Sequence, residues 1–170
     1  MSFWSKLSGL SASDISAAVK KGGLEKVKAL LERNPELVFK KDSLGWTPLH
    51  CAAHWHHRDA AELLLANKAE VNAQDNSGFT PLHCAVGQGF KDVAELLLAK
   101  QAEVNAQDNE GFTPLHLAVD ESREDLVQLL LSSNADVNIK KHDGKTPLGW
   151  AVAKGHFEVA ELLRQHGGHE

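Results

Sequence analysis

Residues 80–83 read Thr-Pro-Leu-His, and the same four residues occur at 47–50 and at 113–116. A fourth copy at 146–149 reads Thr-Pro-Leu-Gly, so the four threonines stand at 47, 80, 113 and 146, at a constant interval of 33. Four of the five prolines lie in these copies, so proline marks the same place in every unit. A period of this length indicates a repeat architecture, in which each repeat is one small supersecondary unit.

Other features recur with the same period. A glycine stands two residues before each Thr-Pro-Leu, small residues follow the motif, and a leucine cluster comes later in the unit. Threonine suits the N-cap of a helix and proline its first turn, so the motif predicts a helix start. A second helix is expected at 92–99, with Val93, Leu96 and Leu97 on one apolar face. A single unit cannot bury these leucines, whereas stacked units can share one core.

Residues 42–168 therefore resemble the ankyrin-repeat family, which carries this motif at this period. A degenerate unit precedes them, with Ala17-Ala18, Gly22-Gly23 and Leu30-Leu31 at the small-residue, turn and leucine positions. The polar Arg164 and Gln165 predict a C-terminal cap. The resemblance implies an all-α solenoid of stacked helix-turn-helix units with projecting β-turn or hairpin loops. We expect one domain with an N-terminal arm and five repeats, at 1–10, 11–41, 42–74, 75–107, 108–140 and 141–170.

The composition is that of an ordinary folded domain, with 170 residues of which 24% are charged and 42% hydrophobic. The net charge of −5 does not indicate the basic surface that nucleic-acid binders carry. No apolar run reaches the roughly 18 residues that a membrane span needs, and residues 1–10 lack the apolar core of a secretory signal. Two cysteines are too few for a disulfide scaffold, so we expect a cytoplasmic protein. We also expect a monomer with no cofactor and with neither a nucleic-acid nor a membrane partner.

The sequence contains ten histidines, a residue type that can bind metal ions and change its charge near neutral pH. For the histidines of the repeated motif the resemblance implies a structural role, hydrogen-bonding within and between repeats; these are His50, His83 and His116. The cluster of His54, His56 and His57 has two interpretations. It could be a metal-binding module, because His50 and His54 have i, i+4 spacing, or a solvated patch that makes partner binding sensitive to pH between about 5 and 7.

The remaining chemistry-bearing residues predict no enzyme. Cys51 and Cys84 are separated by one full period and so occupy equivalent positions in adjacent repeats. Packed helices lie about 8–10 Å apart, and a disulfide needs Cα atoms within about 7 Å, so we expect free, packed thiols. The sequence contains no GxSxG, GxxxxGK[ST] or CxxC motif. We therefore expect no catalytic residues and no resident metal.

Four residues stand where the family usually has a glycine that ends a helix: His56, Lys68, Gln101 and Ser122. If the backbone is left-handed there, each replacement costs stability, up to about 1 kcal/mol.

The resemblance implies a concave partner-binding surface made of turn tips, the residues before Thr-Pro-Leu and the ends of the first helices. Carried onto this chain, the predicted contact residues are Leu44, Trp46, His54, Trp55, Ser77, Phe79, Gln88, Glu110, Phe112, Asp120, Glu121 and Lys145. The three aromatic residues before the motif form either an exposed strip for protein recognition or a packed row that stiffens the stack.

Charge is graded along the same surface. The middle is acidic, with Glu110, Asp120 and Glu121. The C-terminal end is basic; its lysines are Lys140, Lys141, Lys145 and Lys154. The gradient suggests a partner with a basic stretch facing the fourth repeat, or simply a solvated face.

The predicted function is non-enzymatic protein–protein interaction by a rigid scaffold. Two alternatives remain open beside it. One is the metal-binding module at the histidine cluster. The other is asparagine hydroxylation, which the resemblance implies for the Val-Asn positions, Asn72, Asn105 and Asn138. Residues 1–10 are expected to cover the first repeat; the alternatives are contact with a partner or with a membrane surface.

Overall fold

The computed structural model describes residues 11–170, so the predicted arm at 1–10 lies outside the described residues. Residues 11–170 contain ten α-helices, one short 3₁₀-helix and no strand, which confirms the all-α fold. The α-helices are α1 (Ala12–Lys20), α2 (Leu24–Arg33), α3 (Pro48–His54), α4 (Arg58–Ala66), α5 (Pro81–Gln88), α6 (Lys91–Ala99), α7 (Pro114–Asp120), α8 (Glu124–Ser132), α9 (Pro147–Lys154) and α10 (Phe157–Gln165); η2 (Pro35–Phe39) is the 3₁₀-helix.

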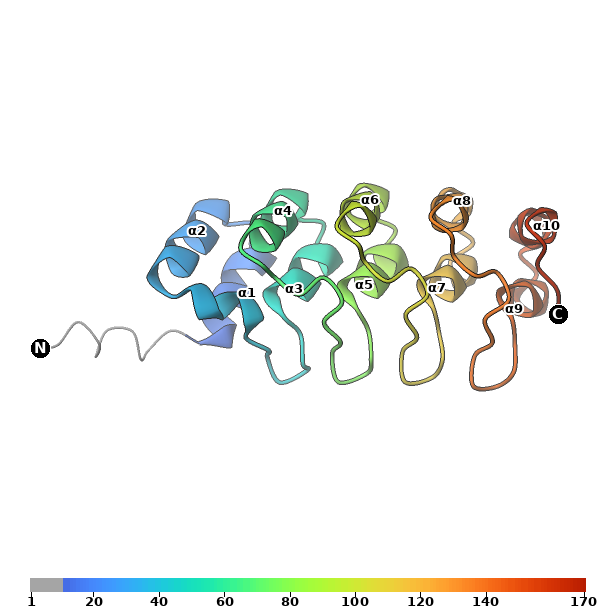
Figure 1. The fold of residues 1–170 in the computed structure, drawn as a ribbon, viewed down its shortest axis with the longest axis horizontal. Coiled ribbons are helices and arrows are strands. Elements are labelled where there is room, and N and C mark those ends of the chain that lie inside the picture. Colours follow the sequence, from blue (N-terminus) through green and yellow to red (C-terminus); the bar gives the residue numbers. More distant parts are fainter. Residues whose placement is uncertain (1–10) are drawn as a thin grey trace, which may run out of the picture.

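The helices stack in two rows (Figure 1). The first helices α1, α3, α5, α7 and α9 form the row beside the projecting turns, and α2, α4, α6, α8 and α10 form the other. Each first helix packs on the first helices before and after it and on its own second helix. The core is therefore a continuous line of small contacts rather than one central cluster.

The repeated motif explains each first helix. Thr47 is the N-cap of α3 and Pro48 its first residue. The His50 N–H donates to the Thr47 hydroxyl oxygen (3.4 Å), while the Thr47 N–H donates to Nδ1 of His50 (3.1 Å). Two backbone N–H groups that have no partner inside the helix are thus satisfied by one threonine and one histidine.

The same histidines connect neighbouring repeats. The Nε2–H of His50 donates to the Phe79 carbonyl (2.9 Å), and that of His83 to the Phe112 carbonyl (3.1 Å). His116 repeats the arrangement with the Lys145 carbonyl at 3.4 Å. All three imidazoles are buried, so their structural role is confirmed. The fourth motif has Gly149 instead, and there the Thr146 hydroxyl donates to the His169 carbonyl (2.6 Å).

The core residues follow the repeat. The second helices bury one leucine each at the same position, Leu64, Leu97, Leu130 and Leu163. The first helices bury an alanine each, Ala52, Ala85, Ala118 and Ala151. Alanine at the inter-repeat contact lets the first helices approach closely, because its side chain is a single methyl group. None of the helices within residues 11–170 has the length and apolar character that crossing a lipid bilayer requires.

Left-handed backbone occurs where the sequence predicts it. His56 and Ser122 have φ of 58° and 51°, and the equivalent positions in the other repeats are Gly89 and Gly155. Lys68, Gln101 and Asn134 have φ of 69°, 66° and 64°, and Gly167 is their equivalent. These residues end a helix in a conformation that favours glycine.

The last repeat is less polar than a cap should be. Arg164 and Gln165 are exposed as expected, but the side chains of Phe157 (71% exposed) and Val152 (37%) also face solvent. Val119, at the position equivalent to Val152, is fully buried by the repeat that follows it.

Acid should weaken the stack through the three motif histidines. Burial lowers the pKa of His50 and His83, and it lowers the pKa of His116 from 6.5 to about 4. In the unfolded chain these histidines become protonated from about pH 6.5 downward, whereas in the folded chain they stay neutral to lower pH. The stability that they contribute is therefore fully present above pH 6.5 and is lost as the pH falls toward 4. His116 alone accounts for up to about 3 kcal/mol.

Urea unfolding at pH 7.5, 6.0 and 4.5 measures this loss, and NMR titration of His116 reads its pKa directly. A free energy of unfolding that stays constant over this range would contradict the expectation.

Replacing Gln101 or Lys68 by glycine should raise the free energy of unfolding by about 0.5–1 kcal/mol, because glycine adopts positive φ without strain. Lys100→Gly is the matched control, since Lys100 has φ of −99°. Thermal and urea denaturation of the three variants test the expectation, which fails if Lys100→Gly stabilises as much as Gln101→Gly.

Candidate protein-interaction surface

Two hollows bring most of the predicted contact residues together. We call the surface formed by the projecting turns and the C-terminal ends of the first helices the turn face. The first hollow, of about 220 Å³, is lined by Trp46, His54, Phe79, His83, Cys84, Gly87, Gln88 and Leu117. The second, of about 380 Å³, is lined by Asn76, Ser77, Phe79, Asp108, Asn109, Glu110, Phe112, Leu117 and Asp120. Because Phe79 and Leu117 line both, the hollows are neighbours.

The other predicted contact residues are exposed and lie outside the linings of these hollows. The side chains of Leu44 and Trp55 are 60% and 50% exposed, respectively. The Trp55 ring lies edge-on to His54, with ring centroids 5.2 Å apart. Glu121 and Lys145 are also exposed. Two large apolar side chains therefore face solvent at the N-terminal part of the turn face.

The aromatic residues that precede the first three motifs, Trp46, Phe79 and Phe112, are half-buried. They therefore form a packed row rather than a freely exposed strip. Each ring packs against the histidine of its own repeat, as Phe79 does against His83 at 5.4 Å between centroids. The indole N–H of Trp46 also donates to the Asp75 carboxylate in the next turn (2.9 Å). These rings stiffen the stack, and they also line the two hollows.

Three aspartates that the sequence analysis did not single out hold the turn tips. Asp75 Oδ1 accepts the N–H groups of Ser77 (2.8 Å) and Phe79 (2.9 Å), and Asp42 and Asp108 do the same in their turns. The Asn109 side chain donates to the Asn76 carbonyl of the preceding tip (3.0 Å). The recurrence of aspartate at 42, 75 and 108 was the available signal, because aspartate commonly closes such turns.

Glycine at the tips serves this close approach. Gly78 has φ of 82°, and a Cβ there would lie 2.8 Å from Oδ1 of Asn109 and 2.9 Å from its backbone nitrogen. Any side chain would therefore push the next turn away. The tips form one linked row, so their exposed side chains are presented on a rigid support.

The acidic middle of the turn face is smaller than predicted. Asp120 accepts from the Trp150 indole N–H (2.9 Å) and pairs with Lys154 (2.8 Å), so its charge is compensated. Burial alone would raise the pKa of Asp120, but these hydrogen bonds outweigh it and hold that pKa below its ordinary value. Among residues 11–170, Glu110 and Glu121 form no ion pair.

The basic end is also altered, because Lys141 is buried rather than exposed. Only 7% of this residue is accessible. Its ammonium group lies 4.1 Å from the Phe112 ring centroid and 3.9 Å from that of Trp150, and 3.2 Å from the Asp143 carboxylate. Lys141 occupies the place that aspartate has in the other turns, and its cation holds the last turn against two aromatic rings.

The histidine cluster separates into three unrelated contacts. His56 stacks on Phe90 at 4.2 Å between centroids and bonds to Asp92 (2.8 Å), while His57 lies 3.2 Å from the Lys20 carbonyl. His54 packs against Trp46 instead, and burial lowers its pKa. In the part of the chain that the structure describes, no three histidine, cysteine or acidic residues converge on a possible metal position.

The thiols and the Val-Asn asparagines have structural surroundings. Cys51 and Cys84 are free and buried, as expected, and burial raises the pKa of Cys84 to about 12. Such a thiol stays protonated and is a poor nucleophile. The asparagines bridge successive repeats: Asn72 accepts from the Glu103 N–H (2.8 Å), and Asn105 from that of Asp136 (2.9 Å). Asn138 likewise accepts from the His169 N–H (3.0 Å).

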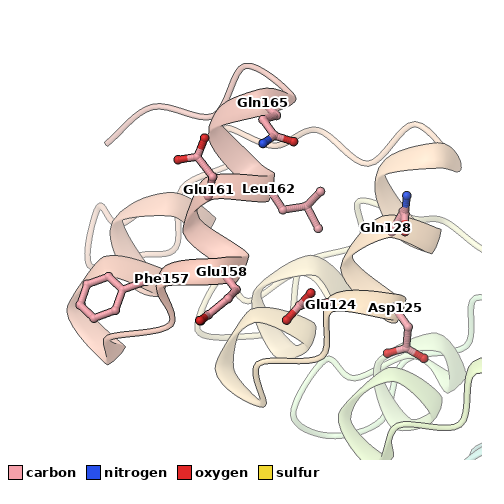
Figure 2. A pocket seen from close by; sticks show the side chains of 8 residues that line it. All are labelled: Glu124, Asp125, Gln128, Phe157, Glu158, Glu161, Leu162 and Gln165. Carbon is pink, nitrogen blue, oxygen red and sulfur yellow. The ribbon is translucent and has the colours of Figure 1, made fainter.

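A larger and more open hollow, of about 720 Å³, lies between α8 and α10, away from the projecting turns (Figure 2). Glu124, Asp125, Glu158 and Glu161 surround it. Leu162 points toward α8, whereas Phe157 points outward. With four carboxylates on its rim and no buried polar group aimed into it, this hollow has the character of a solvated face.

Comparison with known proteins gives a family and several partial relatives. A family model described as ankyrin repeats matches residues 15–108, 70–141 and 102–170. Oxysterol-binding protein-related protein 1 of Homo sapiens is 46% identical over 57 residues, 33% of this chain and 6% of that protein. Protein phosphatase 1 regulatory subunit 12A of Mus musculus is 39% identical over 64 residues, 38% of this chain and 6% of the relative. The 2-5A-dependent ribonuclease of Mus musculus is 38% identical over 58 residues, 34% of this chain and 8% of the relative. The match therefore spans less than a tenth of each relative.

Lys141→Ala should lower the free energy of unfolding by about 2 kcal/mol, because it removes a desolvated cation from between two rings and leaves a cavity. Lys145→Ala is the matched control: Lys145 is exposed and lies 5.1 Å from the Trp150 centroid, so it should change stability by less than about 0.5 kcal/mol. Urea denaturation measures both, and equal effects would mean that the buried cation has no special role.

Proposed function

The chain belongs to the ankyrin-repeat family, and from this premise we propose that it is a non-enzymatic interaction module that binds a partner protein on its turn face. Repeats of this family are generally protein–protein interaction modules. One of the partial relatives is itself named a regulatory subunit, which is a protein that acts on another protein. The family also leads us to propose that the turn face is concave.

The observation that carries the proposal is the combination of two hollows with a rigid row of turns. Leu44 and Trp55 expose apolar surface beside the hollows, and such patches mark interaction sites. The hydrogen bonds that the Asp75 carboxylate accepts and that the Asn109 side chain donates fix the tips before any partner arrives. Binding therefore loses little conformational entropy, which is the main advantage of a preorganised surface.

The partner is a protein rather than a nucleic acid, because the net charge is −5 and the free charges of the turn face include Glu110 and Glu121. Two free cysteines suit a reducing compartment, so the proposed location is the cytoplasm. The proposed state of the chain is a monomer.

Two matched variants test which surface binds. Ser77→Arg/Gln88→Arg adds two cations to the turn face, at positions where other repeats carry Glu110 and Lys154, so the fold tolerates long side chains there. Gln128→Arg/Gln165→Arg adds the same charge on the second-helix side, where both residues are exposed. Affinity purification from cell extract with quantitative mass spectrometry compares both with the wild type.

Proteins captured by the wild type and by the second-helix variant should be lost at least about tenfold from the turn-face variant. Capture that survives the turn-face change and disappears with the second-helix change would place the binding surface elsewhere. Thermal melts establish that both variants remain folded.

A further inference from the structure

From the two hollows we infer the chemistry of the partner: an extended segment in which a bulky apolar side chain is followed, about three residues away, by lysine or arginine. The apolar side chain occupies the hollow at Trp46 and Phe79, and the cation lies beside Glu110 and Glu121. This inference rests on the proposed function, since it concerns the same surface.

The first hollow suits an apolar side chain. Its walls include the Trp46 and Phe79 rings and the Leu117 side chain, and no carboxylate or ammonium group lines it. Open space adjoins Gly87, because a Cβ built there would meet only Leu117 Cδ1, at 3.7 Å. Transfer of an apolar side chain from water into such a site is favourable, and the volume of about 220 Å³ suits one side chain rather than a whole helix.

The second hollow suits a cation. Glu110 is on its rim and exposed, and Glu121 follows Asp120, which also lines it. The lysines on this side of the turn face are paired already: Lys154 with Asp120, and both Lys141 and Lys145 with Asp143. Lys141 also lies over two aromatic rings. The uncompensated charge is therefore that of Glu110 and Glu121.

The spacing follows from the repeat. The two hollows share Phe79 and Leu117 and lie one repeat apart, a step of about 10 Å for packed helices. An extended chain advances about 3.3 Å per residue, so three residues cover that step. A helix rises only about 1.5 Å per residue and would need about seven.

A phage-displayed library of random dodecapeptides, selected on the full chain, tests the inference. Enriched peptides should share leucine, methionine, phenylalanine or isoleucine with lysine or arginine about three positions away. The best peptide should bind Gly87→Leu at least about tenfold more weakly, because the new side chain fills the first hollow. Gly87→Ala is the matched control, since its Cβ makes ordinary contact, and it should bind like the wild type.

The charge arm uses Glu110→Gln/Glu121→Gln against Glu95→Gln/Glu161→Gln on the second-helix side. The first pair of substitutions should lower the affinity for the selected peptide about five- to tenfold at low salt. It should also abolish the preference for peptides that carry the basic residue. The control pair should change neither the affinity nor this preference.

Three outcomes would overturn the inference. They are enrichment of acidic or uncharged peptides, a seven-residue spacing that indicates a helical partner, and no enrichment at all. If proteins are still captured through the turn face, tested by Ser77→Arg/Gln88→Arg, the proposed function stands although the inferred chemistry is wrong. If that capture also survives the change, both fail.

Discussion

The stack depends on one buried imidazole in each central repeat. Nδ1 of His50 accepts from the N–H of Thr47, the N-cap of its own helix, and its Nε2–H donates to the carbonyl that precedes the next motif. Only the neutral ring can do both, since protonation would turn the acceptor nitrogen into a second donor. One side chain thus caps a helix and fixes the distance to the next repeat. Because this constraint recurs, the turns of the turn face are regularly spaced.

The sequence was sufficient for the fold because the fold is periodic. Threonine, proline, leucine and glycine at one constant interval define helix starts, core positions and left-handed residues, and an isolated repeat could not bury its leucines. The left-handed backbone at Lys68 and Gln101 was predicted for the same reason. Periodicity makes each local prediction supported by three others.

The surface was harder to predict because it lies where the repeat is broken. Lys141 replaces an aspartate, and nothing in its position along the chain indicates that two rings, one of them in the preceding repeat, enclose its ammonium group. The sequence predicts a free charge at Asp120, but Lys154 in the following repeat pairs with it. The half-burial of Trp46 likewise depends on Asp75 in the next turn. Such pairings across repeats depend on side-chain direction, which spacing alone does not give.

The ties between repeats have a consequence for how such a chain changes its size. The imidazole bonds join residues 29 positions apart and the tip amide bonds join residues 33 positions apart, so each tie reaches only into the adjoining copy. Excision of residues 76–108 as a block would bring His50 to the Phe112 carbonyl and Asn109 to the Ser43 carbonyl. Recombination between copies can therefore shorten or lengthen the molecule by whole repeats without requiring a new type of contact between repeats.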